Sequence, residues 1–210
     1  MQDDQGTQLD AKTLQLEALL LDIAKATQQH GKRYFIGGGF AVDLAFGGLS
    51  RSHEDLDFYP LEGDTEWWKA WFRARGYDVS RDTDMEPLPN AFSVLSSTEA
   101  FDKGRDYLAD VYPIAIASDG SISMAVKPGA TAVWDGMLTL DGTRGTWPGK
   151  SWNKVTAVSY KGESINVEDV QAVLEQKLAY IKLHPGEQLT EKHLRDFARA
   201  GIKPGDVQPT

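Results

Sequence analysis

The sequence of 210 residues contains no cysteine. Disulfide bonds and thiolate metal sites are therefore excluded. The first residues, Met-Gln-Asp-Asp-Gln-Gly, lack the basic segment and the apolar run of a signal peptide. No apolar run approaches the roughly 20 residues that a helix needs to cross a bilayer. These absences together predict a cytoplasmic protein.

Basic residues are also scarce, with 22 Lys and Arg against 31 Asp and Glu and a net charge of −9. Proteins that hold nucleic acids by their phosphates usually present a basic surface. The charge therefore disfavours a nucleic-acid substrate and favours a cationic acceptor, although acidic residues also simply keep proteins soluble. The candidates for a surface that meets such an acceptor are Glu62, Asp64, Asp82, Asp84 and Glu86.

The 41% hydrophobic content is enough for a sizeable core. Apolar residues at helical spacing predict helices over residues 11–29, 40–46, 64–75, 167–183 and 190–201. Alternating or continuous apolar runs predict strands over residues 34–36, 56–59, 77–80, 91–96, 107–117, 121–126, 155–160 and 164–166. This order predicts an α+β fold, with a catalytic domain over residues 1–166 and a small C-terminal helical region over residues 167–210.

A pair of carboxylates stands out in the segment that begins at Arg51-Ser-His and continues to Phe58. Asp55 and Asp57 are separated by one residue, so on a strand they project from the same face, about 6.6 Å apart along the backbone. Leu56 and Phe58 then point into the core. Two carboxylates this close repel each other unless a cation neutralises them, and magnesium prefers oxygen ligands. An isolated Asp-x-Asp is more often an inert strand end.

Three glycines upstream favour a metal-binding pair over an inert strand end. Gly37, Gly38 and Gly39 separate a predicted strand from a predicted short helix. Glycine permits a positive φ and a close approach of ligand to backbone, and a helix N-terminus attracts phosphate. We therefore expect Gly38 and Gly39 to seat a triphosphate whose metal ions are held by Asp55 and Asp57. A tight turn that serves only packing is the alternative.

The two segments together resemble the polymerase-β-like nucleotidyltransferase superfamily, and more closely its aminoglycoside 2″- and lincosamide-type members. The residues that carry the resemblance are Gly38, Gly39, Phe40, Asp43, Arg51, His53, Asp55 and Asp57. The match is firm over residues 34–60 and extends across the sheet to about residue 117. It implies the superfamily's mixed twisted sheet flanked by helices.

The resemblance also implies an activity. A nucleoside monophosphate would pass from a nucleoside triphosphate, with ATP as the leading candidate, to a hydroxyl of a small molecule such as an aminoglycoside or lincosamide. Two Mg²⁺ ions would serve as cofactors. The alternatives are a toxin-type enzyme that modifies tRNA or protein, and a non-catalytic nucleotide-binding relative.

Three further site assignments follow from the resemblance. It implies a third carboxylate that binds metal or acts as the general base, and Asp110 on the strand beside Asp57 matches best. Asp102 and Asp106 are the alternatives, and Tyr112 stands where the family often has His. In the family Arg51 and His53 position phosphate or brace the loop. A basic residue of the C-terminal helix reaches the triphosphate, and Lys177 is the candidate.

Tryptophan is abundant, with six residues. Helical spacing predicts that Trp67 and Trp71 belong to the core. Trp147 and Trp152 flank Pro-Gly in a predicted loop, so they are the better candidates for the wall of a binding site.

Overall fold

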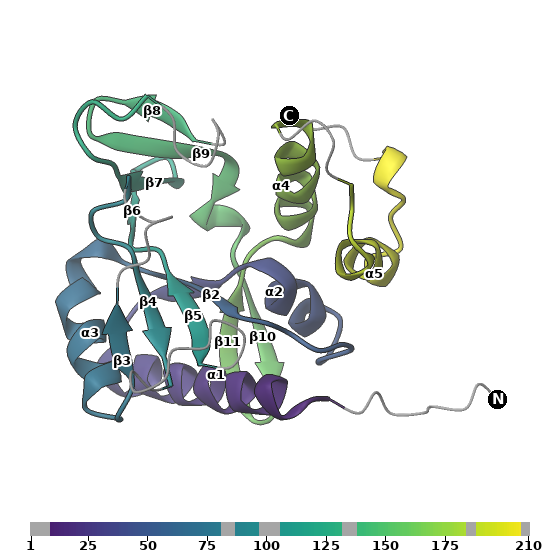
Figure 1. Cartoon of the computed structure of the whole chain (residues 1–210), viewed down its shortest axis with the longest axis horizontal. Coiled ribbons are helices and arrows are strands. Elements are labelled where there is room, and N and C mark those ends of the chain that lie inside the picture. Colours follow the sequence, from purple (N-terminus) through teal and green to yellow (C-terminus); the bar gives the residue numbers. More distant parts are fainter. Residues whose placement is uncertain (1–8, 81–86, 97–105, 132–137, 184–187, 207–210) are drawn as a thin grey trace.

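The computed structural model describes residues 9–80, 87–96, 106–131, 138–183 and 188–206, which form two sheets and the helices around them (Figure 1). The α-helices of these ranges are α1 (Ala11–His30), α2 (Gly38–Ala45), α3 (Thr65–Arg73), α4 (Val170–Leu183) and α5 (Glu191–Arg199). Short 3₁₀ turns lie at Glu62–Asp64, Trp152–Lys154 and Pro204–Asp206. No described helix combines the length and apolarity that crossing a bilayer requires.

The larger sheet has seven strands in the order β10-β11-β1-β2-β5-β4-β3. Their bounds are β1 (Tyr34–Ile36), β2 (Leu56–Pro60), β3 (Asp78–Ser80), β4 (Phe92–Leu95), β5 (Tyr107–Val111), β10 (Thr156–Tyr160) and β11 (Glu163–Val167). Strand β2 is antiparallel to β1 and parallel to β5, and β1 is parallel to β11. This mixed sheet with flanking helices confirms the α+β fold class, and the centre of the sheet is the β2–β5 pair.

Helix α1 shows why the sequence pattern was informative. The Asp10 side chain accepts a hydrogen bond of 2.7 Å from the backbone N–H of Thr13, so it caps the start of the helix. Gly31 ends the helix in the left-handed region with φ 62°. Leu16, Leu20 and the other apolar residues of one face are buried against the sheet. The predicted helix over residues 11–29 is confirmed to within one residue.

Alternation along the central strands divides the interior between two faces of the large sheet. Leu56 and Phe58 of β2 are fully buried in the main core, together with side chains of α1, α2 and α3. Phe35 of β1 and Tyr59 of β2 point to the other face, where they pack against the small sheet. Asp57 shares the parity of Tyr59, so it too leaves the main core.

The smaller sheet has four strands in the order β6-β7-β9-β8. These are β6 (Ile114–Ile116), β7 (Ser121–Ala125), β8 (Thr139–Asp141) and β9 (Arg144–Ser151). The prediction of one strand over residues 107–117 was wrong, because Pro113 lies between β5 and β6 and the two belong to different sheets. Strands β8 and β9 were not predicted.

Strand β9 is irregular where it passes the large sheet. Thr146 pairs with Ser123 and Ser151 with Ser121, so five steps along β9 oppose two along β7. The residues between these pairs, which include Trp147 and Lys150, form a bulge. The Pro-Gly dipeptide in this segment predicted a loop, whereas the chain continues as a strand with a local excursion.

The chain leaves the large sheet at β11 and continues directly into α4 and α5. Figure 1 shows these two helices beside the small sheet and above α2. Leu174 of α4 and Phe197 of α5 form a small buried cluster of their own. Helix α4 begins at Val170, three residues later than predicted, and α5 covers the predicted segment that follows Thr190.

Candidate active site

Asp57 and Asp110 form the centre of the site. They occupy paired positions on the parallel neighbours β2 and β5, which confirms that the strand carrying Asp110 lies directly beside that of Asp57. Asp55 lies one residue before β2, which begins at Leu56 as predicted. Burial raises the pKa of Asp57 to about 7, and the charges of Asp55 and Asp110 act in the same direction. The three carboxylates therefore act on one another electrostatically.

Asp110 is surrounded by hydroxyl groups. Burial raises its pKa to about 6, while hydrogen bonds from Tyr107, Tyr112 and Ser93 partly oppose that rise. The Ser93 hydroxyl donates to Asp110 Oδ1 at 3.3 Å. Tyr112, which stands where the family often has His, thus contacts the proposed base directly. A carboxylate with a pKa near neutrality can both take and release a proton.

The two alternatives to Asp110 differ in position. Asp106 is buried just before β5, where its side chain accepts a hydrogen bond of 3.1 Å from the Ser96 hydroxyl. Asp102 lies outside the described residues. The choice of Asp110 as base stays a prediction, which its pairing with Asp57 supports.

The glycines lie closer to Asp57 than the sequence suggested. Gly38 and Gly39 are the first residues of α2, not a linker before it. Gly38 has φ +58°, and a Cβ built on it would lie 1.9 Å from Asp57 Oδ2. The Gly37 N–H donates to the backbone carbonyl of Asp57 at 3.0 Å. A side chain at position 38 would thus displace the carboxylate, so a glycine is needed here for a close approach as well as for its backbone conformation.

Arg51 and His53 brace the loop between α2 and β2. Arg51 donates from Nε and Nη2 to the two oxygens of Asp196, at 2.9 and 3.1 Å. His53 Nε2 lies 3.0 Å from Asp43 Oδ2, and both side chains are almost completely buried. A Cβ on Gly39 would lie 2.2 Å from Arg51 Nη2, so this glycine makes room for the guanidinium. Contact of Arg51 or His53 with phosphate stays a prediction.

A cleft of about 1140 Å³, called here the main cleft, lies between the large sheet and the C-terminal helices. Its lining includes Gly38, Gly39, Arg51, His53, Asp55, Asp57, Lys177, Lys192 and His193. The structure thus brings seven of the eight predicted site residues to one cleft. Lys177 also contacts Asp196, at 3.2 Å, so it belongs to the same buried ion-pair network as Arg51.

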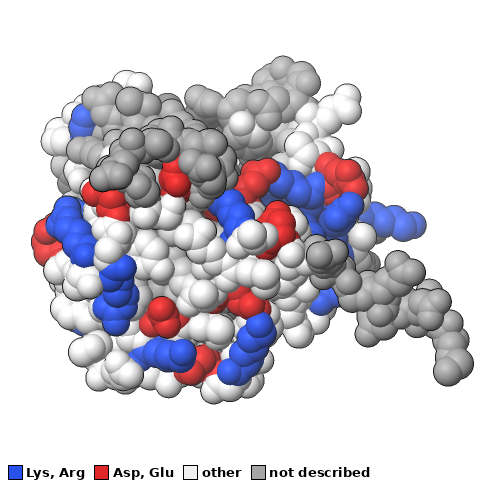
Figure 2. Space-filling model, turned by 60° about the horizontal axis from the view of Figure 1, so that its bottom comes forward, with Lys and Arg blue, Asp and Glu red and all other residues white. Residues whose placement is uncertain are grey.

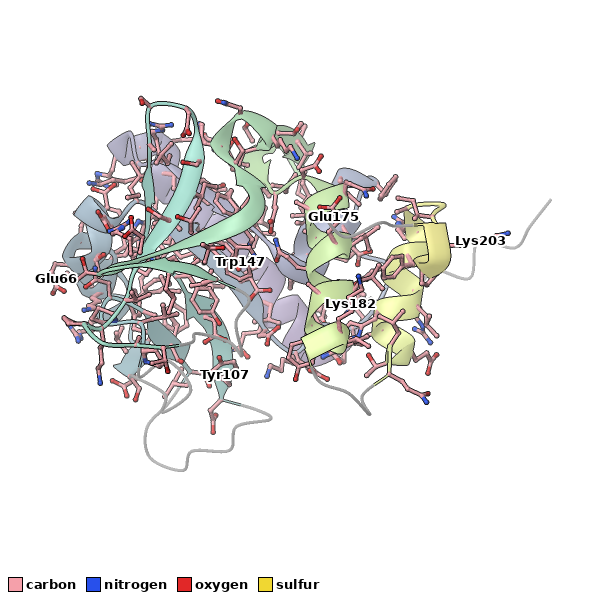
Figure 3. All side chains as sticks on the ribbon, turned by 90° about the horizontal axis from the view of Figure 1, so that it is seen from above. Glu66, Tyr107, Trp147, Glu175, Lys182 and Lys203 are labelled. Atoms are coloured by element: carbon pink, nitrogen blue, oxygen red, sulfur yellow. The ribbon has the colours of Figure 1, made fainter. Side chains whose placement is uncertain are left out.

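A smaller recess of about 280 Å³ adjoins the main cleft and shares Gly38, Asp57 and Lys177 with it. Tyr59, Tyr112 and Trp147 supply aromatic side chains to its lining, and we call it the aromatic recess. In Figure 3 Trp147 lies near the centre of the molecule, between the strands and α4, which carries Glu175 and Lys182.

The prediction that Trp147 and Trp152 lie in a loop was wrong. Trp147 belongs to β9 and Trp152 to a 3₁₀ turn. Trp147 lines the aromatic recess, whereas Trp152 packs against Phe35 and Arg33. On α3, Trp71 is buried as predicted, and Trp67 is half-buried against Trp68.

Sequence reasoning missed a buried ion pair behind the site. Lys150 Nζ lies 3.1 Å from Glu168 Oε2, and both side chains are at most 4% exposed. The ammonium also lies over the rings of Trp147 and Tyr59, at 3.9 and 4.2 Å from their centroids. Burial lowers the pKa of Lys150, and its charge lowers the pKa of Asp57. The Pro-Gly-Lys segment contains no motif that would predict a buried lysine paired with a glutamate.

The donor set fits magnesium rather than a preassembled protein cage. Among the described residues, no three His, Asp or Glu side chains are gathered closely enough to hold a metal by themselves. Magnesium, however, usually binds through one or two carboxylates together with water and substrate phosphates. Asp57 and Asp110, which are paired across β2 and β5 and carry raised pKa values, offer such a partial set.

Comparison with known proteins assigns the family. A model of the aminoglycoside-2''-adenylyltransferase family matches residues 19–200, which include both sheets and both C-terminal helices. The chain belongs to this family. It is accordingly a nucleotidyltransferase. A comparison with curated proteins gave no match.

Solved structures share the fold of this family member. The lincosamide antibiotic adenylyltransferase LnuA, in a lincomycin-bound crystal structure, is 21% identical with a TM-score of 0.58, over 88% of this chain and 96% of that one. The antibiotic-resistance factor ANT(2'')-Ia in solution is 17% identical with a TM-score of 0.61, over 93% and 88%. The crystal structure of ANT(2'')-Ia in complex with adenylyl-2''-tobramycin is 17% identical with a TM-score of 0.57, over 90% of this chain and 88% of that one.

Proposed function

We propose that this family member transfers a nucleoside monophosphate from a magnesium-bound triphosphate to a hydroxyl of a small antibiotic. AMP is the nucleotide that we expect it to transfer. The observation that carries the proposal is the Asp57–Asp110 pair, set on adjacent parallel strands with raised pKa values, directly behind the backbone of Gly38. Such a pair has no structural use in a protein core, because burial and mutual repulsion both disfavour its charged form.

The residues divide the chemistry between them. Asp110, with a pKa of about 6, accepts the proton of the acceptor hydroxyl. The hydroxyl oxygen forms a bond to the α-phosphorus while the bond to pyrophosphate breaks. Asp57 and Asp110, with Asp55 beside them, would hold the magnesium together with water and the phosphates of the substrate. Bound magnesium neutralises charge on the phosphate oxygens in such reactions.

The triphosphate belongs in the main cleft. The backbone of Gly38 and Gly39 opens α2, whose N-terminus favours an anion, and Lys177 faces the same cleft from α4. The Tyr112 hydroxyl bonds to the base Asp110, so the aromatic recess adjoins the point where the acceptor hydroxyl must lie. We therefore assign the triphosphate to the main cleft and the acceptor to the aromatic recess.

The acidic residues named from the sequence do not supply a free surface for a cationic acceptor. Glu62 pairs with Arg144 at 2.7 Å and Asp64 with Lys32 at 2.6 Å. The other three candidates, Asp82, Asp84 and Glu86, lie outside the described residues. On the face in Figure 2, basic and acidic side chains of the described residues are interspersed, a pattern that does not favour a polyanionic substrate.

Magnesium-dependent release of pyrophosphate tests the proposal. Each of the four nucleoside triphosphates is offered with lincomycin, with tobramycin and with bulk tRNA. We expect release with ATP and at least one antibiotic, and its loss in Asp57→Asn, which should still unfold in a cooperative thermal transition. Release with tRNA alone would favour the toxin-type alternative. Undiminished turnover in Asp57→Asn would contradict the metal assignment.

A further inference from the structure

His193 is a residue of the site that the sequence pattern did not single out. It lies in the first turn of α5, where its Nδ1 accepts a hydrogen bond of 3.3 Å from the backbone N–H of Thr190. The Thr190 side chain in turn accepts from the backbone N–H of His193, which completes a capping box. A neutral imidazole has one acceptor nitrogen and one N–H. Because Nδ1 accepts, the proton lies on Nε2, and the cap fixes both the tautomer and the ring.

The imidazole stays neutral near physiological pH. Burial lowers the pKa of His193 to about 4, and the charges of Lys177, Lys192 and Arg51 act in the same direction, against the opposing charge of Asp196. The ring therefore offers a hydrogen-bond donor that carries no net charge.

The position of this donor relates it to both parts of the site. His193 lines the main cleft and also the aromatic recess, together with Gly38, Asp57 and Lys177. A group at this junction lies where the triphosphate and the acceptor must meet, if the assignments made above hold. Asp57 of β2 lines both cavities with it.

Cationic side chains of the main cleft already have protein partners. Arg51 and Lys177 both contact Asp196, and Lys192 donates to Glu54 at 2.8 Å. The imidazole Nε2, in contrast, makes no hydrogen bond to any residue within the described ranges. A fixed donor in a binding cleft, with its other nitrogen committed to a helix cap, is arranged to meet an acceptor on a ligand.

We propose that the Nε2–H of His193 donates a hydrogen bond to a phosphate oxygen of the bound triphosphate. This inference rests on the proposed function, and it names a substrate contact on α5. A neutral donor orients the phosphate without adding to the charge that Lys177 brings. The capping box thus gives α5 a direct role at the reaction centre.

Two substitutions separate the two nitrogens of the ring. His193→Asn places an amide oxygen near the position of Nδ1, so it keeps the cap acceptor but loses the distal donor. His193→Gln places an amide N–H₂ near the position of Nε2, and glutamine is a usual residue at this position of a capping box, so it keeps both the donor and the cap. The readouts are kcat/KM for the triphosphate, from pyrophosphate release, and the thermal melt, each measured on the full chain.

We expect His193→Asn to melt like the parent protein and to lose about 10–100-fold in kcat/KM for the triphosphate, the range for a hydrogen bond to a charged group. We expect His193→Gln to melt like the parent protein as well and to keep most of its kcat/KM. Parent-like turnover in His193→Asn, or an equal loss in both variants, would overturn the contact while leaving the proposed function intact. A parent protein that neither binds Mg-triphosphate nor releases pyrophosphate would overturn both.

Discussion

Arg51 and Asp196, 145 residues apart in the sequence, are joined by two hydrogen bonds and are almost completely buried. The pair ties the loop before β2 to α5, and Lys177 of α4 joins it from a third direction. The ion-pair network therefore holds the loop that carries Asp55 against the two C-terminal helices. One carboxylate thus joins three segments: the loop before β2, α4 and α5.

Removal of that carboxylate should be costly. Asp196→Leu leaves Arg51 and Lys177 without their shared partner, and we expect a loss of about 3 kcal/mol or more in the free energy of unfolding. Arg51→Met should lose less, because Lys177 remains to pair with the carboxylate. Arg195→Leu, which removes an exposed ion pair on the same helix, is the control and should stay within about 0.5 kcal/mol. Urea denaturation measures all three, and equal losses in Asp196→Leu and Arg195→Leu would contradict the network.

Gly38→Ala should abolish turnover for a steric reason that a matched glycine can isolate. Gly38 and Gly142 have nearly the same φ, +58° and +60°, but a Cβ on Gly142 would have no neighbour within 4 Å. Both alanine variants should therefore pay about 1–2 kcal/mol for the left-handed backbone. Only Gly38→Ala should displace Asp57, and we expect at least a hundredfold loss of kcat, an order of magnitude typical for misplaced catalytic groups. Equal activity of the two variants in a pyrophosphate assay would show that the close approach is unimportant.

The raised pKa of Asp57 makes stability depend on pH in a defined direction. The unfolded chain releases this proton near pH 3.8, the ordinary pKa of an aspartate, whereas the folded protein keeps it to about pH 7. The folded state binds more protons in this window, so its stability falls as pH rises from about 4 to 7. Asp57→Asn lacks this contribution. In thermal melts, the melting temperature of the variant should therefore rise relative to that of the parent protein between pH 5 and 8. A constant difference across that range would mean that Asp57 is not desolvated.

Lys150 should influence both stability and the pH profile. Lys150→Met leaves Glu168 buried without its cation, and we expect a loss of about 3–5 kcal/mol. The loss of a positive charge also raises the pKa of Asp57 further, so the acid limb of the pH–rate profile should move to higher pH. A second substitution, Glu168→Leu, should restore much of the stability but not the position of the limb. If the limb stays in place in Lys150→Met, the buried ammonium does not act on the carboxylate.

The sequence pattern, the family resemblance and the spacing of strands were sufficient to place part of the candidate site. Asp57 and Asp110 could be placed on neighbouring strands because a resemblance named the third carboxylate and strand spacing fixed its reach. The glycines were assigned correctly in position but not in structure, since α2 begins two residues earlier than its apolar spacing suggested. Whether these residues bind metal and phosphate stays a prediction.

The residues that sequence reasoning missed share a different property. Lys150 meets Glu168 only through the tertiary packing of the two sheets, and His193 reaches the main cleft only through the position of α5. A lone lysine in a Pro-Gly context and a lone histidine on a polar helix carry no periodic signal of their own. Strands β8 and β9 were missed because β8 has only three residues and the glycines and proline within β9 interrupt any alternation of polar and apolar residues.

The bulge in β9 allows one strand both to pair with β7 and to place a side chain at the candidate site. On its two sides, Thr146 and Ser151 keep the ladder with β7 in place, while the segment between them brings Trp147 to the aromatic recess and Lys150 against its ring. An insertion or deletion confined to this segment would reshape the wall of the aromatic recess and leave the flanking ladder in register. Under the proposed function, the choice of acceptor would therefore diverge through small changes of length at a single internal point, without any rebuilding of β2 and β5.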